Sequence, residues 1–282
     1  MILLQYGLIV FNTDKNYRLI MKKLLIAAIA SAAIGTSAHA EKAFENLSVL
    51  TSVSFESEYV FRGIQLADEV IQPSVELRAD NLYAGFWASV PLEDEYSEEI
   101  NLYVGYTVPV NDKLGIDLGY MYYWYVNDDD AIAPANLGGQ GFGYDFRNEV
   151  YFGVYGNMFL RPQLFFYYDI NLDQIVVEFS AGHSYSLENV SEKLRNASIE
   201  LGGYVGAAAA DDVNGSQNAG SPENSYSYWG VTADLAFRIK DGLAATVGVR
   251  YAGNTDDWTP TITPSADKDN NFYWGASISA GF

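Results

Sequence analysis

The chain has 282 residues and no cysteine, and its 16 Lys and Arg against 36 Asp and Glu give a net charge of −20. Without cysteine, the chain can form no disulfide framework, thiolate nucleophile or Cys-ligated metal site. The negative balance also excludes a nucleic-acid partner, whose phosphates it would repel.

The first segment with a recognisable pattern is 21–40, which reads MKKLLIAAIASAAIGTSAHA. A Lys-Lys pair near its start precedes a short apolar run, and an Ala-His-Ala tripeptide ends it. This pattern predicts a secretory signal peptide, because the apolar run is too short for a transmembrane helix. Residues 1–20 precede a good initiator methionine, so we treat them as an over-long start or an extension. We expect 41–282 to form the mature domain.

After residue 40 the chain alternates apolar and polar residues, the period expected of strands with one apolar face. In the final stretch NFYWGASISAGF, for example, Phe272, Trp274 and Ile278 alternate with Tyr273 and Ser277. Most of these segments are near ten residues long, which is enough to cross a bilayer at a tilt. The predicted strands are about twelve in number: 47–61, 71–79, 82–91, 98–110, 114–126, 147–156, 160–170, 174–187, 197–208, 226–239, 243–252 and 271–282.

The connections between these strands alternate in length. Those at 80–81 and 240–242 are short, whereas those at 127–146 and 253–270 are long. Outer-membrane barrels alternate short periplasmic turns with long outer loops, and a soluble sandwich has no reason to do so. The sequence therefore predicts an all-β fold, a transmembrane antiparallel up-and-down β-barrel of about 12 strands, in the outer membrane of a Gram-negative bacterium.

Aromatic residues fall at the ends of the predicted strands, and amphipathic rings favour the two membrane interfaces. We expect Tyr59, Phe61 and Trp274 on the lipid face at the outer rim, and Phe282 at the periplasmic rim. The last strand must close the barrel against the first, so that no strand edge stays unpaired in lipid. A terminal aromatic also resembles the C-terminal signal for outer-membrane assembly, so Phe282 is the expected assembly signal.

The stretch 57–90 reads SEYVFRGIQLADEVIQPSVELRADNLYAGFWASV. Three parts of it carry a likeness to a known family: Tyr-Val-Phe-Arg-Gly-Ile at 59–64, Gln-Pro at 72–73 and Tyr-Ala-Gly-Phe-Trp-Ala-Ser at 83–89. In these parts the chain resembles the TorF-like porins, a poorly characterised family of bacterial outer-membrane proteins. It departs from them in the acidic insert 92–99 and in its Asp-rich loops. The resemblance implies a barrel and a channel, and it implies no particular solute.

If the apolar side chains face lipid, the alternate ones face the lumen, and many of these are charged or aromatic. Intramembrane charges are costly unless they are paired or wetted, so they indicate a water path or a packed polar interior. We expect Arg62 to lie inside near the outer rim, paired with an acid such as Glu58 or Glu76. The expected pore-lining residues are Glu58, Arg62, Glu76, Arg78, Trp87, Tyr103, Asp117, Glu149, Glu178 and Arg250.

The long outer loops are acidic, and a cluster of carboxylates at a pore mouth concentrates cations within about 8–10 Å. The run Asp128-Asp129-Asp130 could also hold Ca²⁺, but it lacks the spaced carboxylates of a calcium loop, so a solvated acidic face is the preferred interpretation. We therefore expect no metal and no cofactor. The outer-loop acids expected to attract cations are Glu93, Asp94, Glu95, Asp128, Asp129, Asp130, Asp256 and Asp257, with Glu99 in the same group.

These features predict an outer-membrane porin-like channel for small solutes, with a cation bias from its outer loops. A non-conducting surface, structural or adhesion barrel is the alternative, and an outer-membrane hydrolase is a third class. A Ser-His hydrolase needs its histidine beside a serine, but His183 alternates with Val177 and Phe179, which favours a lipid-side position. We therefore expect no enzyme. The expected partners are outer-membrane lipid and lipopolysaccharide, the assembly machinery, and small solutes or cations, and a homo-oligomer stays open.

Overall fold

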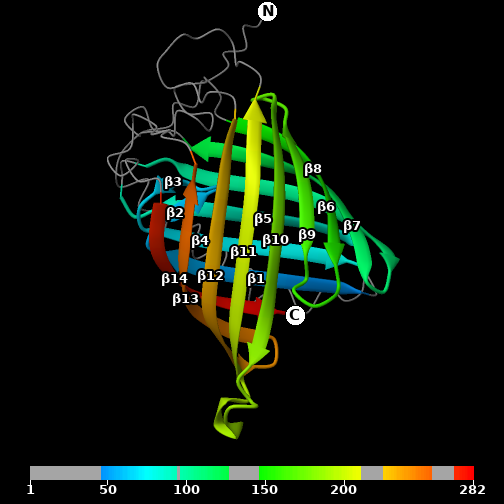
Figure 1. Cartoon of the computed structure of the whole chain (residues 1–282), viewed down its shortest axis with the longest axis vertical. Helices are drawn as coiled ribbons and strands as arrows, with labels where there is room; N and C mark the ends of the chain where they lie inside the picture. Colours follow the sequence, from blue (N-terminus) through cyan, green and yellow to red (C-terminus); the bar gives the residue numbers. More distant parts are fainter. Residues whose placement is uncertain (1–45, 94–95, 127–145, 211–224, 256–269) are drawn as a thin grey trace, which may run out of the picture.

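The computed structural model describes residues 46–93, 96–126, 146–210, 225–255 and 270–282. Within them the chain forms a closed barrel of twelve antiparallel strands, which confirms the predicted fold class (Figure 1). The front and rear strands cross in this view, as expected when the strands of a closed barrel are tilted. No helix in the described ranges is long and apolar enough to cross a membrane.

The wall strands follow the predicted segments to within a few residues, apart from the first. In barrel order they are β1 (Leu47–Glu56), β4 (Val70–Ala79), β5 (Leu82–Pro91), β6 (Glu98–Asn111), β7 (Leu114–Val126), β8 (Phe146–Gly156), β9 (Gln163–Asp169), β10 (Gln174–Ser186), β11 (Ala197–Ala210), β12 (Ser225–Lys240), β13 (Leu243–Asn254) and β14 (Asn270–Gly281).

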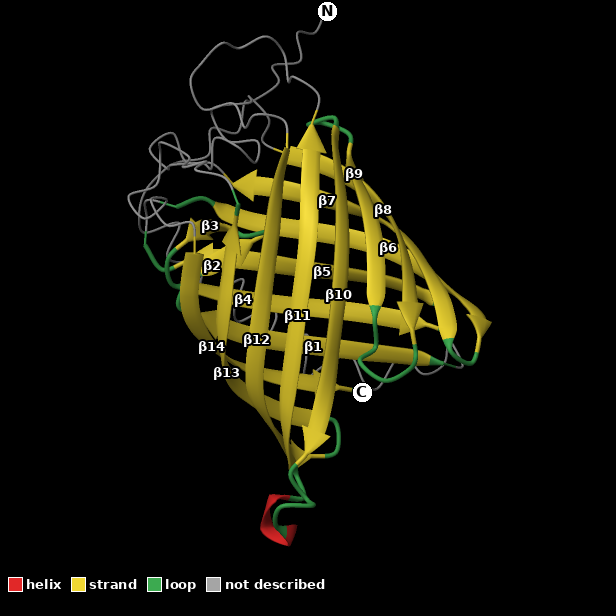
Figure 2. Cartoon of the chain, in the orientation of Figure 1, coloured by secondary structure: helices red, strands yellow, loops and turns green. Residues whose placement is uncertain are grey.

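The two ends of the barrel differ. One end carries the links 80–81, 112–113, 157–162, 187–196 and 241–242, and we call it the turn end. The 187–196 link holds the 3-10 turn η2 (Glu192–Leu194), which projects below the wall in Figure 2. The opposite end, which we call the loop end, receives the remaining connections between wall strands.

The seam between the first and last strands closes the wall. β14 pairs with β1 from Leu50 opposite Gly281 to Glu56 opposite Gly275. Beyond this ladder, Val49 and Phe282 each donate a backbone hydrogen bond to the other, both at 3.0 Å. The predicted closure of the last strand against the first is therefore confirmed.

The outer surface of the wall is apolar. Leu102 on β6, Phe152 on β8 and Ile278 on β14 are 49%, 41% and 59% exposed, and they belong to the faces that the alternation assigned to lipid. A closed barrel with an apolar outer face and a polar interior is the architecture of outer-membrane proteins. In water such a surface would be a severe aggregation hazard.

The first predicted strand, 47–61, was too long. β1 ends at Glu56, and the chain then forms β2 (Tyr59–Phe61) and β3 (Ile64–Ala67), which pair only with each other as a two-stranded sheet. We call residues 57–69, which contain this sheet, the luminal hairpin. All four residues of β3 are buried, so both of its faces are covered, whereas the wall strands alternate between covered and exposed positions.

The positions expected for Tyr59 and Phe61 were therefore wrong. They were expected on the lipid face, but they pack inside the barrel against Ile64, Leu66 and aromatic residues of β7. The period-two pattern runs without a break from β1 into β2, because both are strands. The pattern therefore could not show that the chain leaves the wall after Glu56 and turns into the lumen.

Candidate functional site

The luminal hairpin reaches into the barrel interior from the loop end, where it connects β1 to β4. At its tip, Arg62 makes a two-pronged ion pair with Glu149 on β8, with Nη1 to Oε2 at 2.9 Å and Nη2 to Oε1 at 3.1 Å. The two side chains are 6% and 1% exposed. The Tyr123 hydroxyl donates a further hydrogen bond to Glu149 at 2.9 Å. The expectation that Arg62 lies inside the barrel and pairs with an acid is therefore confirmed, but the acid is Glu149 and not Glu58 or Glu76.

The other side of the tip contacts the opposite part of the wall. Asn254 on β13 donates from Nδ2 to the Gly63 carbonyl oxygen at 3.0 Å. A Cβ at Gly63 would lie 2.4 Å from the Gly253 carbonyl oxygen and 2.8 Å from the Tyr228 Cβ, so only glycine fits here. The hairpin tip is thus held between β8 on one side and β12 and β13 on the other.

An apolar cluster fills the space between the hairpin and β7. Ile64 and Leu66 of β3 pack with Tyr123 and Tyr125, and all four are at most 5% exposed. The rings of Phe61 and Tyr123 lie 6.4 Å apart between centroids. Burial of such side chains is worth about 1.5–3 kcal/mol each, so the hairpin is packed in place and not merely enclosed.

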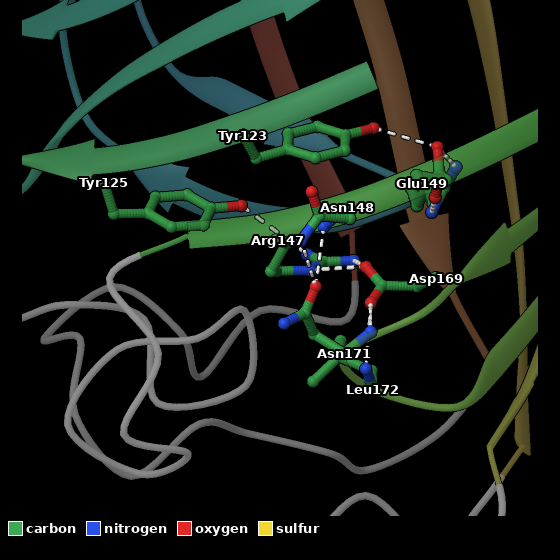
Figure 3. Close-up of polar contacts among 9 residues, drawn as sticks. Tyr123, Tyr125, Arg147, Asn148, Glu149, Asp169, Asn171 and Leu172 are labelled. Carbon is green, nitrogen blue, oxygen red and sulfur yellow. Dashed lines mark hydrogen bonds and ion pairs between the residues drawn. The ribbon is translucent and has the colours of Figure 1, made fainter. Parts of the chain in front are cut away.

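A second buried ion pair lies beside this cluster (Figure 3). Arg147 on β8 donates from Nε to Asp169 Oδ2 at 2.6 Å, and both side chains are completely buried. The other carboxylate oxygen of Asp169 accepts the backbone N–H groups of Asn171 and Leu172 at 2.9 and 2.8 Å. Asp169 therefore both neutralises Arg147 and forms the turn between β9 and β10.

Glu99 is also buried inside the barrel near these residues. It was expected in a solvated outer loop, but it lies on β6 facing inward and is only 4% exposed. Its carboxylate accepts hydrogen bonds from Asn101 at 2.8 Å and from the Tyr59 hydroxyl at 3.1 Å. The acid therefore anchors the base of the hairpin and does not belong to a cation-attracting loop surface.

Below the hairpin, tyrosine rings lie flat on the wall over glycines of the neighbouring strands. A Cβ on Gly119 would meet the Tyr151 ring at 2.1 Å, and one on Gly105 would meet the Tyr83 ring at 2.2 Å. The hydroxyls of Tyr83 and Tyr151 share a hydrogen bond of 2.6 Å, and Tyr83 donates to Asp117 at 2.7 Å. These rings therefore pack against the inner face of the wall.

Charged side chains occupy the same middle layer. Arg250 on β13 lies 3.0 Å from Asp234 and 3.4 Å from Glu56, so one base faces two acids. On β4, Arg78 pairs with Glu76 at 2.5 Å. Acids outnumber bases among the described inward-facing wall residues of this layer and the layer below it. The acids are Glu56, Glu76, Asp117, Glu178, Glu200 and Asp234, and the bases are Arg78, Arg238 and Arg250.

The turn-end half of the lumen holds a cavity of about 970 Å³. Serines line much of it, with Glu76 and Glu200 on its wall, and the exposed side chains of Arg195, Arg238 and Lys240 at its mouth. This volume is large enough for a small solute. The lumen therefore holds a cavity with many polar side chains toward the turn end, whereas packed, buried side chains fill it toward the loop end.

Most of the expected pore-lining residues are dispersed around the wall. Tyr103 donates to Glu76 at 3.0 Å, and the Tyr228 hydroxyl donates to Glu178 at 2.9 Å. The Trp87 ring packs on Tyr59 of the hairpin, with ring centroids 5.6 Å apart. Within this set, ion pairs and hydrogen bonds join Arg62 to Glu149, and Glu76 to Arg78 and Tyr103. Glu58 lies in the hairpin, in the link before β2, and is not part of the wall.

Sequence reasoning missed Arg147 and Asp169. Both sit on the inward face, since Arg147 alternates with Glu149 along β8, and Asp169 stands opposite Glu149 in the ladder. The alternation could have placed Arg147 in the lumen, but it carried no information on a partner 22 residues away.

The single described histidine, His183, lies between the rings of Phe159 and Tyr185, at 4.9 and 4.6 Å between centroids.

Several predicted residues lie outside the described part of the chain. They are the loop acids Asp94, Glu95, Asp128, Asp129, Asp130, Asp256 and Asp257, together with the predicted signal peptide at 21–40. Glu93 is described and exposed at the loop end. Across the described residues, no group of three or more acidic or histidine side chains could hold a metal ion.

Comparison with known proteins gives one family and several distant structures. A family model described as "Bacterial protein of unknown function (Gcw_chp)" matches residues 40–269. No curated protein matches the chain significantly. The KdgM porin has 8% identity and a TM-score of 0.49 over 83% of this chain and 99% of its own. The NanC porin has 8% identity and a TM-score of 0.48 over the same shares.

OprD from Pseudomonas aeruginosa has 11% identity and a TM-score of 0.38, over 85% of this chain and 66% of its own. This chain therefore spans about two thirds of the OprD length. At such identities and TM-scores these likenesses carry no argument about solute or mechanism. The function of this chain is therefore inferred from its own strand pairing and its own luminal side chains.

Proposed function

The chain belongs to the Gcw_chp family of bacterial proteins of unknown function, and from its barrel we propose that it is an outer-membrane porin-like channel for small solutes with a preference for cations. The observation that carries this proposal is the polar cavity of about 970 Å³ inside a closed wall with an apolar outer face. A barrel whose interior is only packing would have no reason to keep such a space lined with serines and carboxylates.

The preference for cations is argued from charge. The inward-facing acids of the described wall outnumber the bases, and fixed charges in a narrow, partly desolvated lumen act more strongly than the same charges in water. The acidic outer loops would add to this by concentrating cations at the mouth. Lipid and lipopolysaccharide around the wall, and the assembly machinery that would read Phe282, are the partners we propose.

Planar-bilayer conductance of the purified protein in a KCl gradient tests the proposal. Discrete current steps with a reversal potential on the cation side are the expected result. Steps with a reversal potential on the anion side would contradict the cation preference but would still support a channel. Complete silence from protein that shows the heat-modifiable mobility of a folded barrel would contradict the channel itself.

Neutralising the wall acids is expected to reduce the cation preference. In the double variant Glu56→Gln and Asp234→Asn, Arg250 loses both of its partners and becomes a net positive charge in the lumen. We expect the cation-to-anion permeability ratio to fall by about threefold or more, because a fixed charge in the lumen acts at short range. The ratio is measured from the reversal potential, and an unchanged ratio would remove these residues from the ion path.

Neutralising the loop acids should have a weaker and salt-dependent effect. Replacing Asp128, Asp129 and Asp130 with asparagine removes charges that we expect to be solvated, and such charges are screened over a distance of about 8 Å at physiological ionic strength. We expect the permeability ratio to fall at about 0.01 M KCl, where the screening length is long, and to stay unchanged at about 1 M KCl. A fall of equal size at both concentrations would contradict a surface-charge mechanism.

A non-conducting surface barrel is the second candidate function. The specific observation that favours it is the luminal hairpin, whose apolar residues close the loop end of the lumen. A barrel closed in this way permanently would carry no current. The two candidates therefore differ in whether the hairpin can leave its place.

A further inference from the structure

Only the two ends of the luminal hairpin pair with the wall: Ser57 exchanges hydrogen bonds with Trp274 of β14, and the Glu69 carbonyl oxygen accepts from Leu92. β1 and β4 pair directly along their whole length, from Leu47 opposite Ala79 to Glu56 opposite Val70. The chain leaves the wall after Glu56 and returns to it at the neighbouring position, Val70. Residues 57–69 are therefore an insertion at the loop end, and the twelve-strand barrel stays closed whether or not they lie inside it.

The turn at the hairpin tip is built for a fixed shape. Arg62 and Gly63 are the two central residues, and both have positive φ, 49° and 77°. This combination is the tight two-residue turn that matches the twist of a β-hairpin. A positive φ strains the backbone of Arg62, because residues with a Cβ rarely adopt it. Glycine would adopt this conformation without strain, so the contacts of the Arg62 side chain must offset the strain.

The Arg62 side chain is needed for position more than for strength. A buried ion pair adds little net stability over an apolar contact of the same volume, because desolvation offsets most of the attraction. Removing one member is nevertheless strongly destabilising, since the other charge stays buried without a partner. An ion pair between the tip and β8 therefore makes docking of the hairpin depend on one specific contact.

Docking also has a cost that favours release. Gln65 on β3 is 5% exposed, and no described residue offers its Oε1 a hydrogen bond. The amide nitrogen of the same side chain is satisfied, because Nε2 donates to Asp68 at 2.7 Å. An unsatisfied buried acceptor makes docking less favourable, and the oxygen would be hydrated if the hairpin moved into the loop-end solvent.

We propose that the luminal hairpin is the gate of this channel, and that the Arg62–Glu149 ion pair is its latch. In the docked position described here the hairpin closes the loop end of the lumen. When the latch opens, the hairpin leaves as a unit, the wall keeps its twelve strands, and the cavity at the turn end becomes continuous with the loop end. This inference rests on the proposed channel function.

The test compares four proteins in planar bilayers, each checked for a folded barrel by heat-modifiable mobility. In the first variant, an Asn-Gly turn replaces residues 57–69 and joins Glu56 directly to Val70, as a tight hairpin allows. In the second, Arg62→Met removes the charge of the latch and keeps the length of the side chain. In the third, Lys113→Met removes one exposed positive charge at the turn end, which the hairpin does not contact. The fourth is the unchanged chain.

The unchanged chain and Lys113→Met should both show rare openings. Arg62→Met should raise the open probability on the order of tenfold or more, since an uncompensated buried Glu149 disfavours the docked state. The variant without the hairpin should be open continuously, with the largest current steps.

The remaining outcomes separate the two proposals. If the variant without the hairpin is folded and silent, the channel function itself is wrong. If that variant conducts and Arg62→Met behaves like the unchanged chain, the channel function is supported. The proposal that the Arg62–Glu149 ion pair holds the hairpin in place is then wrong. If all four proteins conduct equally, the hairpin does not close the lumen and the gate is wrong.

Discussion

Replacing Asp169 with alanine is expected to lower the free energy of unfolding by about 3–5 kcal/mol, the cost of leaving one member of a buried ion pair without its partner. Arg147 would stay in a completely buried position with its main counter-charge removed. The two backbone N–H groups that donate hydrogen bonds to Asp169 at the β9–β10 turn would also lose their acceptor. Urea unfolding of the protein refolded in lipid vesicles, followed by tryptophan fluorescence, measures this change.

Two matched variants separate the charge from the turn. Asp169→Asn keeps an oxygen that can accept both backbone N–H groups, so it should be less harmful than alanine by about 1–2 kcal/mol, roughly one net hydrogen bond each. Adding Arg147→Met to Asp169→Asn removes the orphaned charge and should restore most of the lost stability. If this double variant is as unstable as Asp169→Asn alone, the ion pair is not the source of the effect.

Replacing Gly119 with alanine should push a tyrosine ring off the wall and into the lumen. A Cβ at this position lies 2.1 Å from Cζ of Tyr151, so the ring must move and its contact with the Tyr83 hydroxyl is broken. Overpacking of this kind costs about 1–3 kcal/mol. We also expect smaller current steps in the open channel, because the displaced ring narrows the lumen.

Gly203→Ala is the control for this prediction. The Cβ there would face the lipid side at ordinary distances, 3.4 Å from the Gly230 carbonyl oxygen and 3.6 Å from Val231. Both substitutions reduce the freedom of the unfolded chain equally, so the difference between them isolates the ring. Equal stability and equal conductance in the two variants would show that the tyrosine rings adapt without cost.

The wall of the barrel could be predicted from the sequence because every wall strand repeats one physical requirement. Alternate residues such as Leu102 and Val104 meet lipid, and those between them, such as Tyr103, meet the lumen. A period of two reports this directly, and short turns mark where one strand ends and the next begins. The closure of the seam could be predicted as well, because a membrane barrel must leave no edge unpaired.

The interior could not be predicted in the same way. Alternation shows which face a residue occupies, but it does not show which residues across the lumen meet. Arg62 pairs with Glu149, which is 87 residues away in the sequence, and Arg147 pairs with Asp169, which is 22 residues away. Both contacts depend on the curvature of the closed wall and on the inward course of the hairpin. The Tyr-Val-Phe-Arg-Gly-Ile motif carries a family likeness in the sequence, and in the structure it forms the turn of the luminal hairpin.

The direct pairing of β1 with β4 has a consequence for the order of folding. Most wall strands pair with their sequence neighbours, so these ladders have short loops to close and can form early. The contact between Arg62 and Glu149 requires β8 to be in place already, and the seam between β1 and β14 is more distant still. We therefore expect the hairpin to dock late, after the wall strands that it contacts, β8 and β13 among them, have paired.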